Sequence, residues 1–407
     1  MTASGPEGAR RAGTCPHEDF DALAPETFDS AWAVYDRLRD QCPVAYSRAW
    51  GGYWALTRYA DVLAAATDPA TFITSVQNVV PRLAFTGRRP PLHLDPPEHT
   101  PYRRALNPLF GAQRIAALEA PTRRFAVELL EPMLARGEGD ICDEYSSRLP
   151  VYVFGEWMNL PPDLLATLRD AGRRFNVAVQ NAVDAEVRET SLALYDMARR
   201  VIAMRRDAPL DPATDPTSAL LAARHDGEPL PEEMIVGTVR QVLVVGIIAP
   251  TVLIGSIAVH LSRDRALQDR LRADPSLIPA AVEEFLRLYT PYRGFARTAT
   301  HEVEIGGRKI AEGEPIALVY ASANRDEAVF EDGGAFRLDR PNIGEHLAFG
   351  RGPHNCPGHQ IGRLQLRVTL EELLARTRGF ELAGPVKPTR CPEIGALSVP
   401  LRFAPRD

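Results

Sequence analysis

The chain is poor in cysteine and almost free of lysine. Its 407 residues include five cysteines, an odd number scattered along the sequence, and only Lys309 and Lys387 are lysines. Few, scattered cysteines are typical of a protein in a reducing cytosol and argue against a disulfide framework. The formal net charge of −6 argues against nucleic acid as a main partner. We therefore expect a cytoplasmic protein, and we expect it to be a monomer.

Long apolar segments are also scarce. Residues 1–30 lack the apolar stretch of a signal peptide, and we expect them to form a flexible leader. Only residues 242–261 are long enough and free enough of charge to cross a membrane. Pro250 and His260 lie inside this segment, and a buried central helix of a large soluble protein has the same pattern. We interpret it as such a helix and expect no membrane.

The rest of the pattern is helix-rich, with a small β component in the first and last thirds, so residues 31–407 are expected to form one mainly α domain. Residues 44–56 predict a hairpin. Residues 72–91 predict a long loop, and such loops often carry function. Helical periodicity extends from residue 99 to about residue 233, and strand patterns follow a helix expected at residues 276–288.

The most informative stretch runs from Phe349 to Gly358 and contains Cys356. Its glycines let the backbone turn tightly and approach a flat ligand closely. Pro357 suits the first turn of a helix expected at residues 357–377. A cysteine at a helix N-terminus favours the thiolate, which can act as a nucleophile, a zinc ligand or an iron ligand. No second Cys or His lies at zinc-like spacing from Cys356, which argues against zinc.

This stretch, Phe-Gly-Arg-Gly-Pro-His-Asn-Cys-Pro-Gly, resembles the haem-binding loop of the cytochrome P450 family, Phe-Gly-x-Gly-x-(His or Arg)-x-Cys-x-Gly, at every fixed position. The resemblance implies the cytochrome P450 fold and a haem b cofactor. It implies that Cys356 is the axial thiolate ligand of the iron, whose electron donation favours O–O cleavage. Phe349 would pack beside the sulfur, and Gly358 would belong to the haem-binding set.

Residues 95–104, Asp-Pro-Pro-Glu-His-Thr-Pro-Tyr-Arg-Arg, are similar to the family's Asp-Pro-Pro-x-His-Thr-x-x-Arg-Arg stretch, which holds a haem propionate. His99 and Arg103 lie four residues apart and therefore on one helix face. Arg297 and His354 are similar to two further propionate contacts, in keeping with the pairing of such cations with carboxylates. A surface cation is the alternative for each residue.

Glu284 and Arg287 lie three residues apart on one helix face, a spacing that is usually a surface salt bridge. In the family, a Glu-x-x-Arg ahead of the cysteine belongs to a buried structural triad, and Arg340 is similar to its third member. The resemblance implies that these residues support the fold behind the haem without a direct catalytic role.

The central helix departs from the family pattern (Ala or Gly)-Gly-x-(Asp or Glu)-Thr-(Thr or Ser), in which the acid and the hydroxyl deliver protons to oxygen. Ile248 stands where the acid is expected, and Ala249 stands where the Thr is expected. Thr251 lies about 200° around the helix from Ala249. It reaches the site only if Pro250 distorts the helix. The candidate catalytic positions are Gly246, Ala249, Pro250 and Thr251.

The resemblance implies monooxygenation, such as hydroxylation or O-dealkylation, of a small or medium apolar or aromatic molecule with O2 and external electrons. The altered helix leaves other routes open. A substrate hydroxyl or ordered waters can deliver the protons, peroxide can serve directly as oxidant, or the reaction is phenol coupling or nitration. Fatty-acid peroxygenases of the family carry Arg-Pro where this chain has Ala249-Pro250, so that carboxylate anchor is missing. A non-catalytic haem-thiolate sensor is a further alternative.

The resemblance places the substrate pocket between the early loop, the middle helices, the central helix and two late strands. The apolar candidates are Val79, Val80, Leu83, Phe85, Phe175, Val179, Val242, Val245, Ala249, Phe295, Ile394 and Leu397. The candidates for orienting a polar group are Asn78, Arg82 and Arg293. Ordinary core packing is the alternative for the apolar set.

No flavin- or nicotinamide-binding segment is visible, so we expect a ferredoxin and a ferredoxin reductase to supply electrons. The candidates for a positive face toward an acidic partner are Arg104, Arg351, Arg363 and Arg367. A solvated helix face is the alternative for these arginines.

Overall fold

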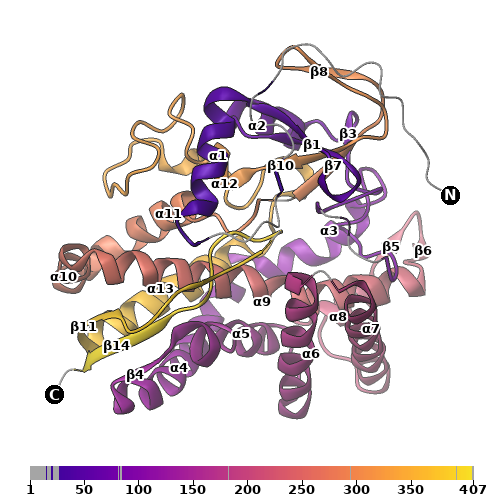
Figure 1. The fold of residues 1–407 in the computed structure, drawn as a ribbon. Helices are drawn as coiled ribbons and strands as arrows, with labels where there is room; N and C mark the ends of the chain where they lie inside the picture. The colour runs from indigo at the N-terminus through magenta and orange to yellow at the C-terminus, as the bar shows by residue number, and fades with distance from the viewer. Residues whose placement is uncertain are drawn as a thin grey trace.

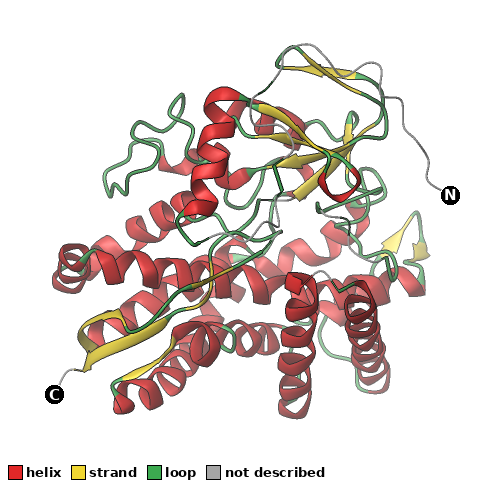
Figure 2. Cartoon of the chain, in the orientation of Figure 1, coloured by secondary structure: helices red, strands yellow, loops and turns green. Residues whose placement is uncertain are grey.

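The computed structural model describes residues 15, 20–21, 27–80, 82, 85–181, 183–293, 295–390 and 392–405. Helices fill the centre and the lower part of the molecule, while strands gather at its upper right and lower left (Figures 1 and 2). The predicted fold class, mainly α with a small β component, is confirmed.

The α-helices are α1 (Ser30–Gln41), α2 (Tyr59–Thr67), α3 (Thr100–Leu106), α4 (Ala112–Arg136), α5 (Leu149–Trp157), α6 (Pro162–Asn181), α7 (Asp184–Asp207), α8 (Pro216–Ala222), α9 (Glu232–Arg263), α10 (Arg265–Ala273), α11 (Ile278–Leu288), α12 (Tyr320–Ala323) and α13 (His359–Arg376). A π-helical turn, η3 (Ile141–Ser146), precedes α5.

The strands are β1 (Val44–Ser47), β2 (Tyr53–Leu56), β3 (Phe72–Ile73), β4 (Glu138–Asp140), β5 (Arg224–His225), β6 (Glu228–Pro229), β7 (Phe295–Ala299), β8 (Val303–Ile305), β9 (Arg308–Ile310), β10 (Pro315–Leu318), β11 (Thr377–Leu382), β12 (Lys387–Pro388), β13 (Ala396–Ser398) and β14 (Pro400–Pro405).

The largest sheet joins distant parts of the chain in the order β1-β2-β10-β7-β3. Strands β1 and β2 form the predicted antiparallel hairpin, and β2 pairs in parallel with β10. Strand β7 was not predicted. Its residues from Ala296 to Ala299 are buried on both faces, which removes the alternation that identifies a half-exposed strand. Since one sheet holds residues 44–73 and 295–318, the first and last thirds of the chain pack as one unit.

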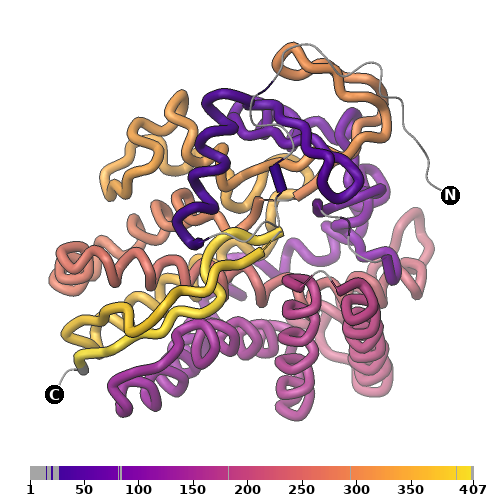
Figure 3. Tube along the Cα trace, in the orientation of Figure 1, coloured from indigo at the N-terminus to yellow at the C-terminus, as the bar shows by residue number. Residues whose placement is uncertain are grey.

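Helix α9 is the predicted central helix, and it is longer at both ends than the apolar segment 242–261. Glu232 and Glu233 form its first turn, where negative charge is favourable. The helix packs against α5, α7, α13 and η3, and its path through the molecule can be followed in Figure 3. Its most apolar 18-residue stretch is 78% buried within the protein, as expected for a core helix.

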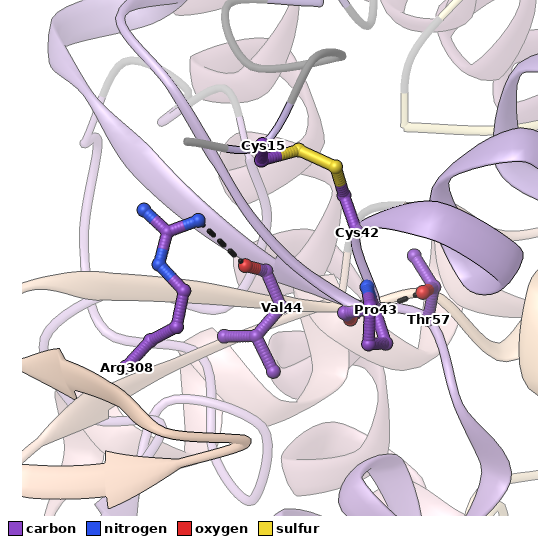
Figure 4. The surroundings of a disulfide bond; sticks show 6 residues. All are labelled: Cys15, Cys42, Pro43, Val44, Thr57 and Arg308. Carbon is purple, nitrogen blue, oxygen red and sulfur yellow. Dashed lines mark hydrogen bonds between the residues drawn. A yellow bond between two sulfur atoms is a disulfide. The ribbon is translucent and has the colours of Figure 1, made fainter. Parts of the chain in front are cut away.

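A disulfide joins Cys15 to Cys42, whose Cα atoms lie 5.6 Å apart (Figure 4). The prediction that the scattered cysteines stay reduced is wrong for this pair. The two residues are 27 positions apart, and no local pattern reveals a contact that only the fold creates. Cys142 and Cys356 are free, and Cys391 lies outside the described residues.

Within the predicted leader, the structure describes only residues 15, 20–21 and 27–30. The ring of Phe20 packs edge-on against Tyr35 and Tyr53. Asp21 accepts a hydrogen bond of 2.9 Å from the indole of Trp50. These described residues are therefore anchored to the domain, and a flexible leader stays a prediction for the others.

Candidate functional site

The loop that carries Cys356 turns back on itself through hydrogen bonds. The Cys356 N–H donates to the carbonyl of Phe349 at 2.9 Å, and the Asn355 side chain donates to the carbonyl of Gly350 at 3.0 Å. Gly352 has a φ of +72°, and a Cβ there would lie 2.4 Å from the carbonyl oxygen of Ala66. Only glycine satisfies both the conformation and the close approach at this position.

Helix α13 begins at His359, with Gly358 as its N-cap, so Cys356 lies just before the helix rather than in its first turn. Burial raises the pKa of the Cys356 thiol, although the Gly358 N–H and the charges of Arg103 and Arg363 act against this rise. The Gly358 N–H thus favours the thiolate while burial opposes it, and the thiolate form of Cys356 stays a prediction. A bound cation has to supply the stabilisation that burial removes.

Phe349 and Gly358 lie where the loop meets α13. The guanidinium of Arg363 stacks over the Phe349 ring at 4.7 Å. A Cβ at Gly362, one turn into the helix, would contact the same ring at 3.5 Å. A Cβ at Gly358 would lie 4.0 Å from the Cys356 sulfur. Any side chain at position 358 would therefore begin in contact with the sulfur.

The four predicted propionate residues come together beside Cys356. The rings of His99 and His354 lie 5.2 Å apart, and His99 Nε2 is 3.3 Å from the carbonyl oxygen of Pro353. Burial lowers the pKa of His354, and the charges of Arg297 and Arg103 lower it further. The Arg103 charge also acts on the Cys356 thiol. These four basic side chains, from α3 and its N-cap, β7 and the cysteine loop, therefore lie together, and we call them the propionate cluster.

Asp95 lies beside the propionate cluster, although the sequence analysis treated it only as part of a motif. It accepts hydrogen bonds from the Thr74 N–H at 2.8 Å and the Ser75 N–H at 3.0 Å, and it lies 3.7 Å from His354 Nε2. Burial alone raises the pKa of Asp95, but contacts from His354, Thr74 and Ser75 hold it well below its usual range. A charged Asp95 orients His354. The sequence signal for Asp95 was its place as the first residue of the matched motif at residues 95–104.

These residues fit a haem. Cys356 offers one thiol, and the propionate cluster offers four basic side chains for two propionate carboxylates. Over the described ranges, no group of three or more His, Cys, Asp or Glu side chains could hold a metal ion by protein ligands alone. Val245 is 47% exposed although it lies in the middle of the core helix α9. An apolar face, one thiol and paired cations suit an iron whose equatorial ligands come from a porphyrin.

The predicted structural triad is assembled in the core. Arg287 donates two hydrogen bonds to Glu284, at 2.8 and 2.7 Å, and Arg340 donates to the same carboxylate at 3.1 and 3.2 Å. The Glu284 and Arg287 residues are 0% exposed and Arg340 is 5% exposed. Arg287 also donates to the carbonyls of Asn324 and Gly333 at 2.8 and 2.7 Å. These three side chains therefore do not form a surface salt bridge, which was the alternative for this spacing.

The middle of α9 differs from the prediction at Thr251. The helix continues through Pro250, and the Thr251 hydroxyl lies 2.7 Å from the carbonyl of Ser146 and 2.8 Å from that of Ile247. The hydroxyl therefore faces η3 in the core, and the expected distortion at Pro250 does not bring it to the site. A Cβ at Gly246 would lie 1.9 Å from the Phe154 ring, which requires glycine there. Gly246, Ala249 and Pro250 remain partly exposed.

A pocket opens along the loop that precedes α3. It is lined by Thr74, Ser75, Val76, Gln77, Asn78, Val79, Arg82, Phe85, Thr86, Gly87, Arg89 and His93. Four residues of the predicted substrate set, Val79, Phe85, Asn78 and Arg82, are among them. Val79 forms a β-bridge with Phe295, another predicted residue, and Leu83 lies outside the described residues.

The other predicted pocket residues do not line this pocket. They are Val80, Phe175, Val179, Val242 and Ile394, all buried, together with the partly buried Ala249 and Leu397 and the exposed Val245. The Ile394 N–H donates to the carbonyl of Pro291 at 3.1 Å, and Arg293 donates to the carbonyl of Glu393 at 2.8 Å. Core packing accounts for the buried residues.

Three buried basic residues were not among the predicted site residues: Arg89 and His93, which line this pocket, and Arg240, which does not line it. The signal was weak, because each looks like one more charge in an arginine-rich chain. Only burial distinguishes them: Arg240 is 1% exposed and His93 is 5% exposed.

Two arginines of the expected partner-binding face are already paired with acids. Arg363 lies 2.6 Å from Glu283, and Arg367 lies 2.9 Å from Glu119. Their charges are largely neutralised, so the prediction of a four-arginine positive face is wrong for this pair. Arg104 is exposed, and Arg351 donates to the carbonyl of Gly344 at 2.8 Å.

Comparison with known proteins places these features in a family. Residues 251–400 match the family model described as Cytochrome P450. The chain is 33% identical over 377 residues to Cytochrome P450 130 of Mycobacterium tuberculosis, covering 90% of this chain and 92% of that protein. It is 31% identical to a linalool 8-monooxygenase of Pseudomonas putida, covering 86% and 89% of the two chains.

The fold is similar to that of solved structures as well. Cytochrome P450 CYP109Q5 from Chondromyces apiculatus superimposes with a TM-score of 0.85 at 28% identity, covering 96% of this chain and 99% of that chain. The likeness therefore extends over nearly the whole chain, including the part that precedes the matched family model.

Proposed function

The chain belongs to the cytochrome P450 family, whose enzymes are haem-thiolate monooxygenases, and we propose that Cys356 is the residue that binds its iron. One observation carries the proposal. Cys356 is a free thiol that lies within the electrostatic reach of Arg103, in a cluster of four basic side chains suited to two carboxylates. The cofactor proposed is haem b, which supplies the iron centre for the oxidation.

Each residue of the site has a distinct task in this proposal. The Gly358 N–H hydrogen-bonds the Cys356 sulfur and favours its thiolate form. His99, Arg103, Arg297 and His354 bind the propionates, and Asp95 holds the His354 ring. Phe349 shields the sulfur side of the loop from water. Glu284, Arg287 and Arg340 fix the backbone behind the cofactor.

The substrate proposed is a small or medium molecule with an apolar or aromatic body, oxidised with O2 and external electrons. The apolar lining of the candidate pocket by Val79 and Phe85 supports this, and one relative is named for its action on linalool. The side chains of Ile248 and Ala249 have no acidic proton to donate. The Thr251 hydroxyl already donates its hydrogen bond to the Ser146 carbonyl. A substrate hydroxyl or ordered waters therefore supply the protons.

A second candidate is oxidation driven directly by peroxide, because that route needs no proton relay at Ile248 and Ala249. Turnover of one substrate is compared with a reductant, ferredoxin and ferredoxin reductase, and then with hydrogen peroxide alone. Fast, tightly coupled turnover with the reductant supports the monooxygenase route. Turnover that occurs only with peroxide supports the second candidate.

The electron donors proposed are a ferredoxin and its reductase, docking near Arg104 and Arg351 on the face that carries Cys356. The protein is proposed to be cytoplasmic, with residues 31–407 forming a single domain. The sheet that combines β1, β2 and β3 with β7 and β10 supports the single domain. Arg104→Gln should weaken the coupling to ferredoxin, with Arg199→Gln, on the exposed side of α7, as the control.

A further inference from the structure

Arg240 is a charged residue in the middle of the core. It lies on α9, is 1% exposed, and its guanidinium stacks over the Phe175 ring at 4.9 Å. Its Nη2 donates to the hydroxyl of Ser191 at 2.9 Å, whereas its Nε has no hydrogen-bond partner. A guanidinium stays protonated in proteins, so this position keeps a full positive charge out of water.

Arg89 and His93 complete a second cluster of basic side chains, which we call the inner cluster. Arg89 Nη2 lies 2.9 Å from His93 Nε2. The same ring nitrogen also lies 2.9 Å from Asn78 Oδ1. Burial lowers the pKa of His93 to about 3, and the charges of Arg89 and Arg240 contribute. His93 thus adds no charge to the inner cluster, and the two arginines carry it.

The inner cluster lacks a counter-charge. Throughout the part of the chain that the structure describes, neither Arg89 nor Arg240 forms an ion pair with a carboxylate. Burial lowers the pKa of Arg240 to about 9, and the charge of Arg89 adds to this lowering. Two buried like charges are unfavourable unless an anion neutralises them. The arrangement is therefore complete only with a bound anion.

The haem propionates are not that anion. The propionate cluster already provides four basic side chains for two carboxylates. The side chains that act on the pKa of His354 are Arg297, Asp95 and Arg103. Those that act on the pKa of His93 are Arg89, Arg240 and Arg88. The two clusters share no member. Arg89 and His93 instead line the pocket beside Phe85, so a ligand in that pocket contacts the Arg89 end of the inner cluster.

We propose that Arg89 and Arg240 bind a carboxylate of the substrate, which is therefore an apolar or aromatic carboxylic acid. Two guanidinium groups match the two oxygens of a carboxylate, and Phe85, which lines the pocket, suits its apolar body. Val245 and Ala249 follow Arg240 by five and nine residues, which is about 8 and 14 Å along the helix. The carbon to be oxidised therefore lies on the order of 10 Å from the acid. This inference rests on the proposed function, since the pocket is taken to be the substrate site.

The Ser191 hydroxyl prepares the site before the ligand binds. It accepts a hydrogen bond from Arg240 and lies 2.7 Å from the Thr86 hydroxyl on the pocket loop. Helix α7 thus connects α9 to the loop that carries Arg89. The backbone also closes tightly here, because a Cβ at Gly237 would lie 2.0 Å from the carbonyl oxygen of Arg88. A preformed pair of arginines binds a carboxylate with little reorganisation.

The test compares acids with their neutral esters on the haem-loaded protein. The probes are 4-methoxybenzoate, 4-methoxycinnamate and decanoate, each with its methyl ester, and binding is measured by calorimetry and by the haem spectral shift. At least one acid should bind roughly tenfold or more tightly than its ester. Arg240→Gln and Arg89→Gln should bring the acid-to-ester ratio close to one and leave ester binding within about twofold. Arg199→Gln is the matched surface control and should keep the wild-type ratio.

Equal binding of acids and esters by the wild type overturns the proposal, and so does a ratio that survives both variants. If no probe binds, the thermal stability of the substrate-free protein tests the proposal instead. Arg240→Leu should raise the thermal midpoint of the substrate-free protein, because an unpaired buried charge is removed. A lowered midpoint overturns the proposal. The thiolate-type band of the reduced carbon monoxide complex is recorded in parallel: its absence from the wild type contradicts the proposed function, whereas its presence without acid preference contradicts only this inference.

Discussion

The hydroxyl of Thr251 lies 2.7 Å from the carbonyl oxygen of Ser146, so the one hydroxyl near the middle of α9 serves the core. Ser146 in turn donates from its own hydroxyl to the Thr251 carbonyl at 3.1 Å. This reciprocal contact fixes α9 to η3. It separates Thr251 from the oxygen chemistry in which other members of the family use a neighbouring threonine.

Thr251→Val should therefore affect stability and leave catalysis unchanged. The variant removes a buried hydrogen bond and should lower the free energy of unfolding by about 1 to 3 kcal/mol. Chemical denaturation measures that loss, and product formed per reductant consumed should stay within about twofold of the wild type. Thr251→Ser keeps the hydroxyl and serves as the control. A strong rise in uncoupled reductant consumption by Thr251→Val alone would contradict the structural role.

Glu284→Gln should destabilise the protein severely. It leaves Arg287 and Arg340 buried without a counter-charge, and breaking such a pair costs about 3 to 5 kcal/mol. Unfolding by denaturant measures the effect. Arg337→Gln is the matched control, since the side chain of Arg337 pairs at the surface with Glu331 and its loss should leave the free energy of unfolding almost unchanged. Similar losses for the two variants would argue against the buried triad.

Glu393 should make stability fall as the pH rises from about 4.5 to about 7. Burial raises its pKa from 4.5 to about 7, although Arg293 and a hydrogen bond from Gln180 act against the rise. Because the folded-state pKa is the higher one, its contribution is fully present below pH 4.5 and is lost as the pH rises to about 7. The shift corresponds to about 3 kcal/mol.

Glu393→Gln should remove this dependence, because the amide stays neutral. Denaturation curves collected between pH 4.5 and 8 should be flatter for this variant than for the wild type. Glu381→Gln, an exposed residue on β11, provides the control. The assignment fails if the wild type and Glu393→Gln show parallel pH profiles.

The Cys15–Cys42 disulfide should stabilise the N-terminal part of the chain. It closes a loop across 27 residues, and its loss in the double variant Cys15→Ser/Cys42→Ser should cost up to about 3 kcal/mol. A thiol titration of the unfolded protein without reductant should find at most three of the five cysteines reactive. Five reactive thiols would show that the bond does not form in solution.

The parts of the site that the sequence predicted best are those encoded by local motifs. The loop around Cys356 and the Glu284–Arg287 spacing each lie within a few residues, so their chemistry can be recognised before folding. Hydrophobic periodicity likewise identified α9 as a core helix. In each case a local rule of helix or turn geometry was sufficient.

The missed features depend on contacts between distant segments. The Cys15–Cys42 bond, the Thr251–Ser146 contact and the contacts of Arg240 with Ser191 and Phe175 all join residues that no sequence spacing relates. Arg240 looked like a charge at the edge of an apolar run, and only the packing of α6 and α7 around it makes it a buried one. Hydrophobic periodicity indicates which face of a helix is apolar, but it does not indicate which element packs against each face.

The central claim is that Cys356 binds the haem iron. It is tested by the absorption spectrum of the reduced, haem-loaded protein with carbon monoxide, recorded for the wild type, Cys356→Ser and Cys142→Ala. Cys142 is the matched control because it is the other free cysteine that the structure describes, and it is fully buried beside Ala396. The account predicts the thiolate-type band in the wild type and in Cys142→Ala and its complete loss in Cys356→Ser. A thiolate-type band that persists in Cys356→Ser would contradict the account.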